Sequence, residues 1–128
     1  MRIFEYKEFT HNMLLEFAQI TNKDDLFYQK YGKVKVYGGG EDGKQKEHNP
    51  PHFHIDFNNG ESTRVKIPSG VEEDLISYDM ILNNKIKKDL KKWFLQPFKM
   101  DKGKNNLEAI KEYWNTLNDG DTNVDLIK

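Results

Sequence analysis

Apolar and polar residues alternate most clearly between residues 33 and 67, and this pattern predicts three strands. The first covers residues 33–37, the second residues 52–57 and the third residues 62–67. The turn sequence Asn58-Asn59-Gly60 joins the last two as a tight hairpin. Since side chains alternate between the two faces of a strand, one set faces the core. That inward set is Val34, Val36, Phe53, Ile55, Phe57, Thr63, Val65 and Ile67.

Two later stretches carry apolar residues at the three- and four-residue spacing of an α-helix. The first begins near Asp79 or Asn83 and ends before Pro97, which cannot continue a helix. The second begins at Asn105, which forms a capping pair with Glu108. A short strand is conceivable between the sheet and these helices, at residues 75–78. The predicted inward residues are Leu82, Ile86, Leu90, Trp93 and Phe94 in the first helix, and Leu107, Ile110, Trp114 and Leu117 in the second.

The N-terminal part is predicted to hold a short strand at residues 1–6 and then a helix capped by Thr10. The helix prediction depends on the helical spacing of Met13, Leu14, Phe17 and Ile20. A further helical turn is expected from residue 24, with its apolar residues buried. The Gly-rich residues 38–46 predict a polar, dispensable hairpin tip.

Together these elements predict the α+β class, with a small antiparallel sheet of three to five strands covered on one face by two or three helices. A length of 128 residues fits a single domain. Within it we expect an extension at residues 1–32 packed on a core at 33–118, followed by an acidic tail at 119–128.

Composition excludes several classes of protein. The net charge of −1 gives no overall attraction to nucleic acid or to membranes, and the absence of cysteine excludes disulfides and thiolate metal sites. No apolar run approaches the roughly 20 residues of a membrane span, and the N-terminus lacks an apolar signal core. We therefore expect a soluble, cytoplasmic protein with no membrane partner.

The chemistry of the chain is concentrated at residues 48–57, His-Asn-Pro-Pro-His-Phe-His-Ile-Asp-Phe, which hold three of the four histidines. The Pro-Pro pair excludes a helix and favours an extended chain. In the strand that follows, His52, His54 and Asp56 share the face opposite the apolar residues. The neighbouring strands add more polar side chains to this outer face. They are Lys35, Tyr37, Arg64 and Lys66.

The segment at residues 48–55 resembles the signature of a small bacterial family, the domain of unknown function 4160. That family has a strand, a His-x-Pro-Pro-His-Phe-His-Val type segment, more strand, and two helices with Trp near the end of each. Here residues 33–37, 83–94 and 105–117 resemble the first strand and the two helices, with Trp93 and Trp114. The chain departs from the family in its N-terminal segment, its Gly/Lys-rich loop and an insertion at residues 97–104. The usual gene neighbourhood of the family resembles toxin–antitoxin modules, which implies a protein partner encoded nearby.

Three interpretations of the outer face are open. The first is a metal site, because neutral imidazole is the commonest metal ligand and strand residues two apart can reach one ion. His52 and His54 supply two ligands, and Asp56 or His48 could supply a third. An open site of histidine and carboxylate would suit zinc, iron or manganese.

The second interpretation is acid–base chemistry on an anionic ligand such as an RNA phosphodiester. His52 and His54 could serve as base and acid, Lys35 and Arg64 could stabilise charge, and Tyr37 could stack on a base.

The third interpretation is that the Pro-Pro-His-Phe-His segment sets the entry and register of a strand, or that the face binds a protein, as in one half of a toxin–antitoxin-like pair. Whether the protein is an enzyme stays open at this point, because fold does not imply function. Burial of His52 and His54 would distinguish a structural role from a site.

Overall fold

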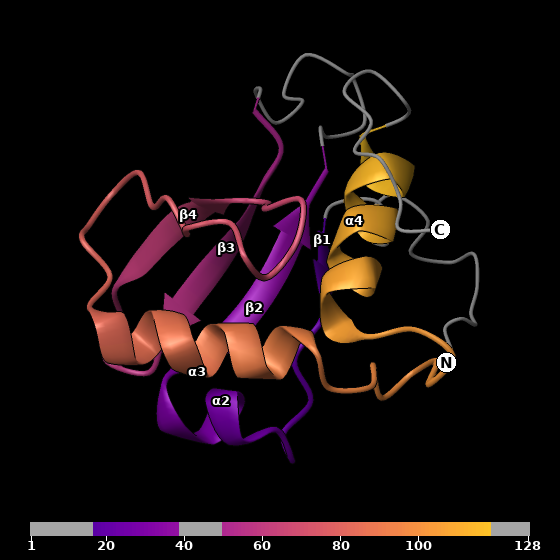
Figure 1. Ribbon diagram of the computed structural model, residues 1–128, viewed down its shortest axis with the longest axis horizontal. Helices are drawn as coiled ribbons and strands as arrows, with labels where there is room; N and C mark the ends of the chain where they lie inside the picture. The colour runs from indigo at the N-terminus through magenta and orange to yellow at the C-terminus, as the bar shows by residue number, and fades with distance from the viewer. Residues whose placement is uncertain (1–16, 39–49, 119–128) are drawn as a thin grey trace.

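The computed structural model describes residues 17–38 and 50–118, which form a four-stranded antiparallel sheet and three helices (Figure 1). The strands follow one another across the sheet in chain order, β1-β2-β3-β4. This arrangement confirms the predicted α+β class. The strands are β1 (Phe17–Gln19), β2 (Gly32–Tyr37), β3 (His52–Phe57) and β4 (Ser62–Lys66), and the helices are α2 (Leu26–Lys30), α3 (Asn84–Phe94) and α4 (Asn106–Leu117).

The inner face of the sheet is the apolar set that the alternation predicts. Val34 pairs with Ile55, and Phe53 pairs with Val65 on the next strand. All four are completely buried. The ring of Phe53 meets that of Phe94 on α3 edge-on, with centroids 5.9 Å apart. Phe57 is the exception to the prediction, because it lies at the end of β3 and is only half-buried.

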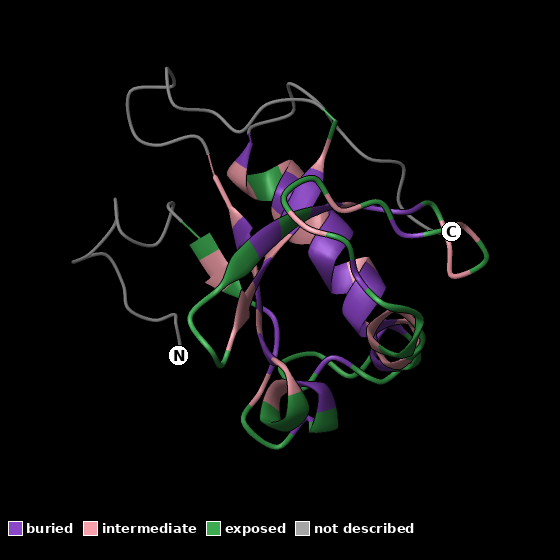
Figure 2. Ribbon diagram, turned by 90° about the vertical axis from the view of Figure 1, so that its left-hand side faces the viewer, coloured by how far each residue is buried: buried purple, intermediate pink, exposed green. Residues whose placement is uncertain are grey.

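Both long helices begin at asparagine caps. The side chain of Asn83 accepts a hydrogen bond of 2.8 Å from the Ile86 amide and starts α3. Asn105 and Glu108 form the predicted capping box of α4, each side chain accepting from the backbone amide of the other. Because these bonds satisfy amides that have no partner inside the helix, the starts of both helices are fixed locally. The buried side of α4 faces the sheet (Figure 2).

The helix expected after Thr10 is wrong where the structure describes it. Phe17–Gln19 is strand β1, in which Phe17 pairs with Tyr37 and Gln19 pairs with Lys35. Phe17 and Ile20 have the spacing of residues on one face of a helix. Hydrogen bonds to β2 nevertheless satisfy the backbone of this short segment, so it forms a strand. The other N-terminal expectations, at residues 1–16, lie outside the described residues, as do the tail at 119–128 and nearly all of the predicted loop at 38–46.

Gly32 fixes the start of β2. Its φ angle is +151°, and a Cβ atom at this position would lie 2.1 Å from the carbonyl oxygen of Asp56. Only glycine allows the two strands to approach so closely here. This contact keeps the register in which Lys33 faces Asp56 and Lys35 faces His54.

The segment between β4 and α3 extends the sheet beyond β4. Ser77 forms an isolated antiparallel bridge with Val65, and the backbone amides of Lys66 and Tyr78 bond to the carbonyls of Ile76 and Arg64. The short strand expected at residues 75–78 is therefore a single bridge. Its consequence is that the side chains of Ile76 and Tyr78 join the outer face of the sheet.

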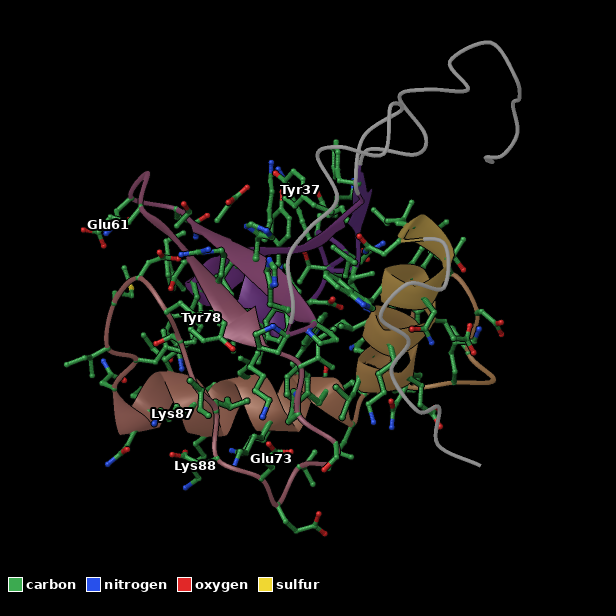
Figure 3. All side chains as sticks on the ribbon, turned by 90° about the horizontal axis from the view of Figure 1, so that it is seen from above. Tyr37, Glu61, Glu73, Tyr78, Lys87 and Lys88 are labelled. Carbon is green, nitrogen blue, oxygen red and sulfur yellow. The ribbon has the colours of Figure 1, made fainter. Side chains whose placement is uncertain are left out.

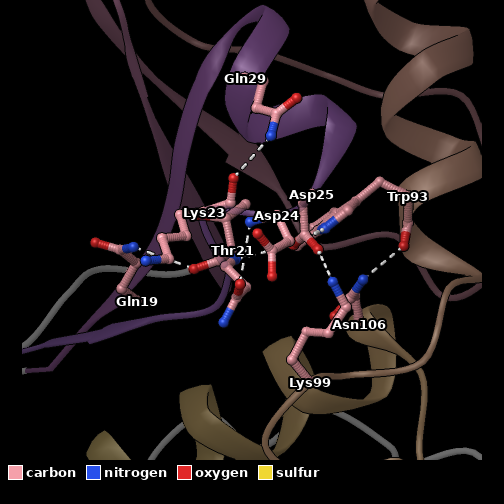
Figure 4. Close-up of polar contacts among 10 residues, drawn as sticks. Gln19, Thr21, Lys23, Asp24, Asp25, Gln29, Trp93, Lys99 and Asn106 are labelled. Carbon is pink, nitrogen blue, oxygen red and sulfur yellow. Dashed lines mark hydrogen bonds and ion pairs between the residues drawn. The ribbon is translucent and has the colours of Figure 1, made fainter.

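A buried carboxylate connects three separate parts of the chain (Figure 4). Asp25, which precedes α2 and is 3% exposed, accepts hydrogen bonds of 2.8 Å from the indole nitrogen of Trp93 and from Lys99 Nζ. Its Oδ2 also accepts from the Asn22 amide at 2.9 Å. The carboxylate of Asp25 therefore holds α2 against α3 and against the loop before α4. No helix among residues 17–38 and 50–118 has the length and apolar character needed to cross a membrane.

Candidate functional site

The outer face of the sheet brings together three of the predicted site residues in one row. Lys35 on β2 lies opposite His54 on β3, and His54 lies opposite Arg64 on β4. Neighbouring strands are roughly 5 Å apart, so these side chains are direct neighbours. We call this row with Tyr37 the cross-strand row. Tyr37 contacts His54, and Tyr78, from the segment beyond β4, contacts Arg64; both tyrosines are labelled in Figure 3.

Lys35 is held by a diagonal ion pair across β2 and β3. Its Nζ lies 2.9 Å from Asp56 Oδ2. The hydrogen bond that Lys35 donates to Asp56 raises the pKa of Lys35 and outweighs the opposing effect of partial burial. The ammonium also lies 5.1 Å from the centroid of the Phe17 ring, within cation–π range. Lys35 is therefore a fixed positive charge at one end of the row.

Arg64 is fixed at the other end by a two-pronged contact. Its Nε and Nη2 atoms donate to the two carboxylate oxygens of Asp79 at 3.0 and 2.8 Å, and its backbone amide donates to Asp79 Oδ2 at 2.8 Å. These hydrogen bonds lower the pKa of Asp79 to about 2. The guanidinium lies 5.9 Å from the centroid of Tyr78. Because the group is planar and is held in a bidentate pair, its orientation is set before any ligand arrives.

The centre of the row is aromatic. The rings of Tyr37 and His54 meet edge to face with centroids 4.4 Å apart, and Phe17 stacks on the other side of Tyr37 at 5.5 Å. His54 and Tyr37 are half-buried, while Phe17 is 40% exposed. Edge-to-face and offset contacts are the favoured geometries of aromatic pairs. His54 therefore lies between the two fixed cations, and the ring of Tyr37 lies beside it.

His52 differs from the expectation that it faces outward beside His54. It is only 5% exposed, and its ring lies 5.3 Å from that of Trp114 on α4 and 5.3 Å from that of His54. Its Nδ1 lies 3.0 Å from the carbonyl oxygen of Pro50. The reason is tertiary, since Trp114 of α4 packs against His52 at the start of β3. His52 is therefore buried, and its ring packs against that of His54.

The predicted metal ligands are only partly described. Within residues 17–38 and 50–118, no group of three or more His, Asp or Glu side chains is arranged to hold a metal ion. Asp56 is engaged with Lys35, and His48 lies outside the described residues. His52 and His54 therefore give at most two neighbouring imidazoles for a metal.

Sequence reasoning missed several groups that shape this face. The sequence predicts a helix start near Asp79 or Asn83, a short strand at residues 75–78 and a helix that includes Phe17, and none of these predictions assigns Asp79, Tyr78 or Phe17 to this face. The alternation of Ile76 and Tyr78 was the available signal for a further edge of the sheet. No comparable local signal marks Lys111 on α4, which is buried and donates a hydrogen bond of 2.7 Å to the carbonyl oxygen of Ser69.

Comparison of the chain with protein-family models, with curated proteins and with solved structures gave no match. The resemblance to the domain of unknown function 4160 therefore stays a prediction.

Proposed function

We propose that the outer face of the sheet binds an anionic ligand, and that single-stranded RNA is the ligand class that fits it best. The observation that carries this proposal is the cross-strand row, in which His54 lies between Lys35 and Arg64 and the ring of Tyr37 contacts that of His54. Single-stranded nucleic acid is bound by aromatic side chains that stack on bases and by cations that contact phosphates. The row supplies both kinds of group on one open sheet face.

Stacking of bases on the rings of the row should contribute to RNA binding. We expect Tyr37→Leu and His54→Gln each to weaken the binding of a short fluorescent RNA by about tenfold, since stacking of one base contributes about 1–3 kcal/mol. Fluorescence anisotropy measures this affinity. Tyr113→Leu is the matched control, because Tyr113, on α4, is also half-buried but packs against Phe98. Equal affinities for all four proteins, or an equal loss in the control, would reject the sheet face as the binding site.

We further propose that this face cleaves the RNA that it binds. His54 is the histidine placed for proton transfer, because it lies next to Arg64 in the row while His52 is buried. His54→Gln should abolish cleavage with little change in stability. His52→Gln should instead cost on the order of 1–3 kcal/mol of stability, because a buried polar partner is lost. Measuring RNA cleavage and urea unfolding for both variants separates the two roles, and cleavage that survives in His54→Gln would end this extension.

A metal would be held by His52 and His54 together with a third ligand, for which His48 and Asp56 are the proposed residues. Such an ion, zinc, iron or manganese, would supply Lewis acidity or an activated water. The test is the metal content of protein purified without a histidine tag, in wild type and in the double variant His52→Gln/His54→Gln. Stoichiometric metal in the wild type and its loss in the double variant are expected. Metal-free wild-type protein that takes up no added zinc would refute the metal proposal.

A protein-binding role is favoured by one specific observation. Both margins of the face carry exposed apolar side chains, with Phe17 at 40%, Ile76 at 46% and Tyr78 at 41% exposure. The cations between them are already paired with Asp56 and Asp79. Exposed aromatic residues beside an arginine are typical of protein interfaces. On this proposal, the product of the neighbouring gene co-purifies with the wild type and not with Ile76→Glu, while RNA binding is absent.

A further inference from the structure

Helix α3 concentrates positive charge on a chain that is almost neutral. Its eleven residues include five lysines and one aspartate, a net charge of +4, whereas the whole chain has a net charge of −1. Such an uneven distribution of charge influences which partners the surface attracts, and it does not determine the fold. The lysines are Lys85, Lys87, Lys88, Lys91 and Lys92.

Three of the five lysines lie on the side of α3 that faces away from the core. Leu90, Trp93 and Phe94 are buried and fix the opposite side of the helix against the sheet. Lys85, Lys88 and Lys92 are exposed and, at spacings of three and four residues, form one stripe. Figure 3 shows Lys88 on the side of α3 that points away from the sheet.

Ion pairs within the described residues account for only part of this charge. Asp89 accepts a hydrogen bond of 2.6 Å from the Tyr31 hydroxyl and pairs with Lys30 at 3.3 Å. Lys85 is 3.9 Å from the same carboxylate, a long contact for an exposed side chain. Residues 17–38 and 50–118 provide no ion-pair partner for Lys88 or Lys92.

Helix electrostatics also oppose this arrangement. Lys85 is the second residue of α3, near the positive end of the helix dipole, and the first turn contains no acidic residue. Lys88 is three residues from Lys85 and four from Lys92, and like charges at these spacings repel each other. Folding of the helix therefore gives no reason for the stripe, whereas binding of a polyanion does.

We propose that the stripe Lys85, Lys88 and Lys92 binds the phosphate backbone of nucleic acid without sequence preference. At 1.5 Å of rise per residue the stripe spans about 10 Å, a length over which a nucleic acid presents several phosphates. An anionic membrane is the less suitable partner, because interfacial helices insert their own apolar face and that of α3 is committed to the core. This surface is on the helical layer, so the proposal does not depend on the function of the sheet face.

The test compares two double variants that change the net charge equally. Lys88→Gln/Lys92→Gln removes two members of the stripe, and Lys23→Gln/Lys102→Gln removes two exposed lysines elsewhere. Binding of a fluorescent DNA duplex of about 20 base pairs is measured over a salt series. We expect the stripe variant to bind about tenfold more weakly at low salt and to reduce the slope of log K against log salt by about 2. The control should match the wild type.

Three results would overturn the proposal. Equal losses in both double variants would show an effect of overall charge, and unchanged binding in the stripe variant would place the contact elsewhere. Binding of phosphatidylserine vesicles that the stripe variant loses, with no duplex binding by the wild type, would identify a membrane surface instead. A Tyr37→Leu/His54→Gln variant distinguishes the two proposals, because it should retain the stripe-dependent binding of the duplex whether or not the sheet face binds RNA.

Discussion

Phe53 is the residue on which the register of the central strand depends. It is completely buried, and it contacts Phe94 from α3. We expect Phe53→Ala to lower the free energy of unfolding by about 3–5 kcal/mol, because it removes a large side chain and leaves a cavity. Phe17→Ala is the control, since Phe17 is exposed and should cost far less. Urea denaturation measures both, and an unchanged midpoint for Phe53→Ala would contradict the register.

Asp79, at the edge of the same sheet, makes the stability of the fold depend on pH. Its pKa in the folded protein is about 2, below the ordinary value of 3.8, because it accepts hydrogen bonds from Arg64. A lowered pKa means that the carboxylate stabilises the fold above its unfolded pKa and that this contribution is lost as the pH falls through about 2.

The corresponding experiment is urea unfolding of wild type and Asp79→Asn at a series of pH values. The difference between their free energies of unfolding should be constant above about pH 5 and should shrink as Asp79 becomes protonated. A difference that persists undiminished at the lowest pH would mean that the charge of Asp79 contributes nothing. Arg64→Gln should show the same dependence, since it removes the cation that the carboxylate binds.

At the scale of single elements, the capping box determines where α4 begins. Asn105 accepts the Glu108 amide at 2.8 Å, and Glu108 accepts the Asn105 amide at 2.7 Å. We expect Asn105→Ala to cost about 1 kcal/mol of stability, because one helix-terminal amide loses its partner. Asn84→Ala on α3 is a matched control, since Asn84 is exposed inside the first turn and no cap depends on its side chain. Thermal or urea unfolding that gives equal values for the two variants would argue against the cap.

At the scale of the whole molecule, Asp25 connects segments that are far apart in the chain. It binds Trp93 and Lys99, which are 68 and 74 residues away. We expect Asp25→Ala to lower the free energy of unfolding by about 1–3 kcal/mol or more, because the indole N–H of Trp93 is then buried without its acceptor. The shift should be visible both in urea unfolding and in tryptophan fluorescence.

Substitutions of two nearby residues, Asp24 and Lys99, serve as comparisons for Asp25→Ala. Asp24→Ala should have little effect, because Asp24 is exposed and its side chain has no comparable contact among the described residues. Lys99→Met should cost more than the loss of an exposed ion pair, since it leaves the buried carboxylate of Asp25 without its cation. Equal losses for Asp24→Ala and Asp25→Ala would show that the buried network does not stabilise the docking of α2.

The two surfaces proposed for binding lie on different layers of the molecule. The cross-strand row is on the open face of the sheet, and the lysine stripe is on the outer side of α3. The core between them keeps the two sets of side chains apart, so substitutions in one set should leave the other intact. Independent variants can therefore assign any observed binding to one surface or the other.

Much of the fold could be predicted because its signals are local. Alternation assigned β2, β3 and β4, and the capping pair with its apolar stripe assigned α4. Lys35, His54 and Arg64 could also be placed on one face, since strand periodicity alone determines the side on which a residue lies. Strand β1 was predicted wrongly because a three-residue strand has too little periodicity, and only its pairing with β2 defines it.

The sequence by itself determined the alternating strands, the start of the last helix and the residues of the cross-strand row, because each depends on neighbours within a few positions. Tertiary structure alone decided that α4 buries His52, that Asp79 pairs with Arg64 and that Asp25 binds Trp93. These contacts depend on how whole elements pack, and no short-range pattern in the chain encodes the distance between groups that are 15 to 68 residues apart. For this reason the types of group in the candidate site could be predicted, and the burial, pairing and orientation of those groups could not.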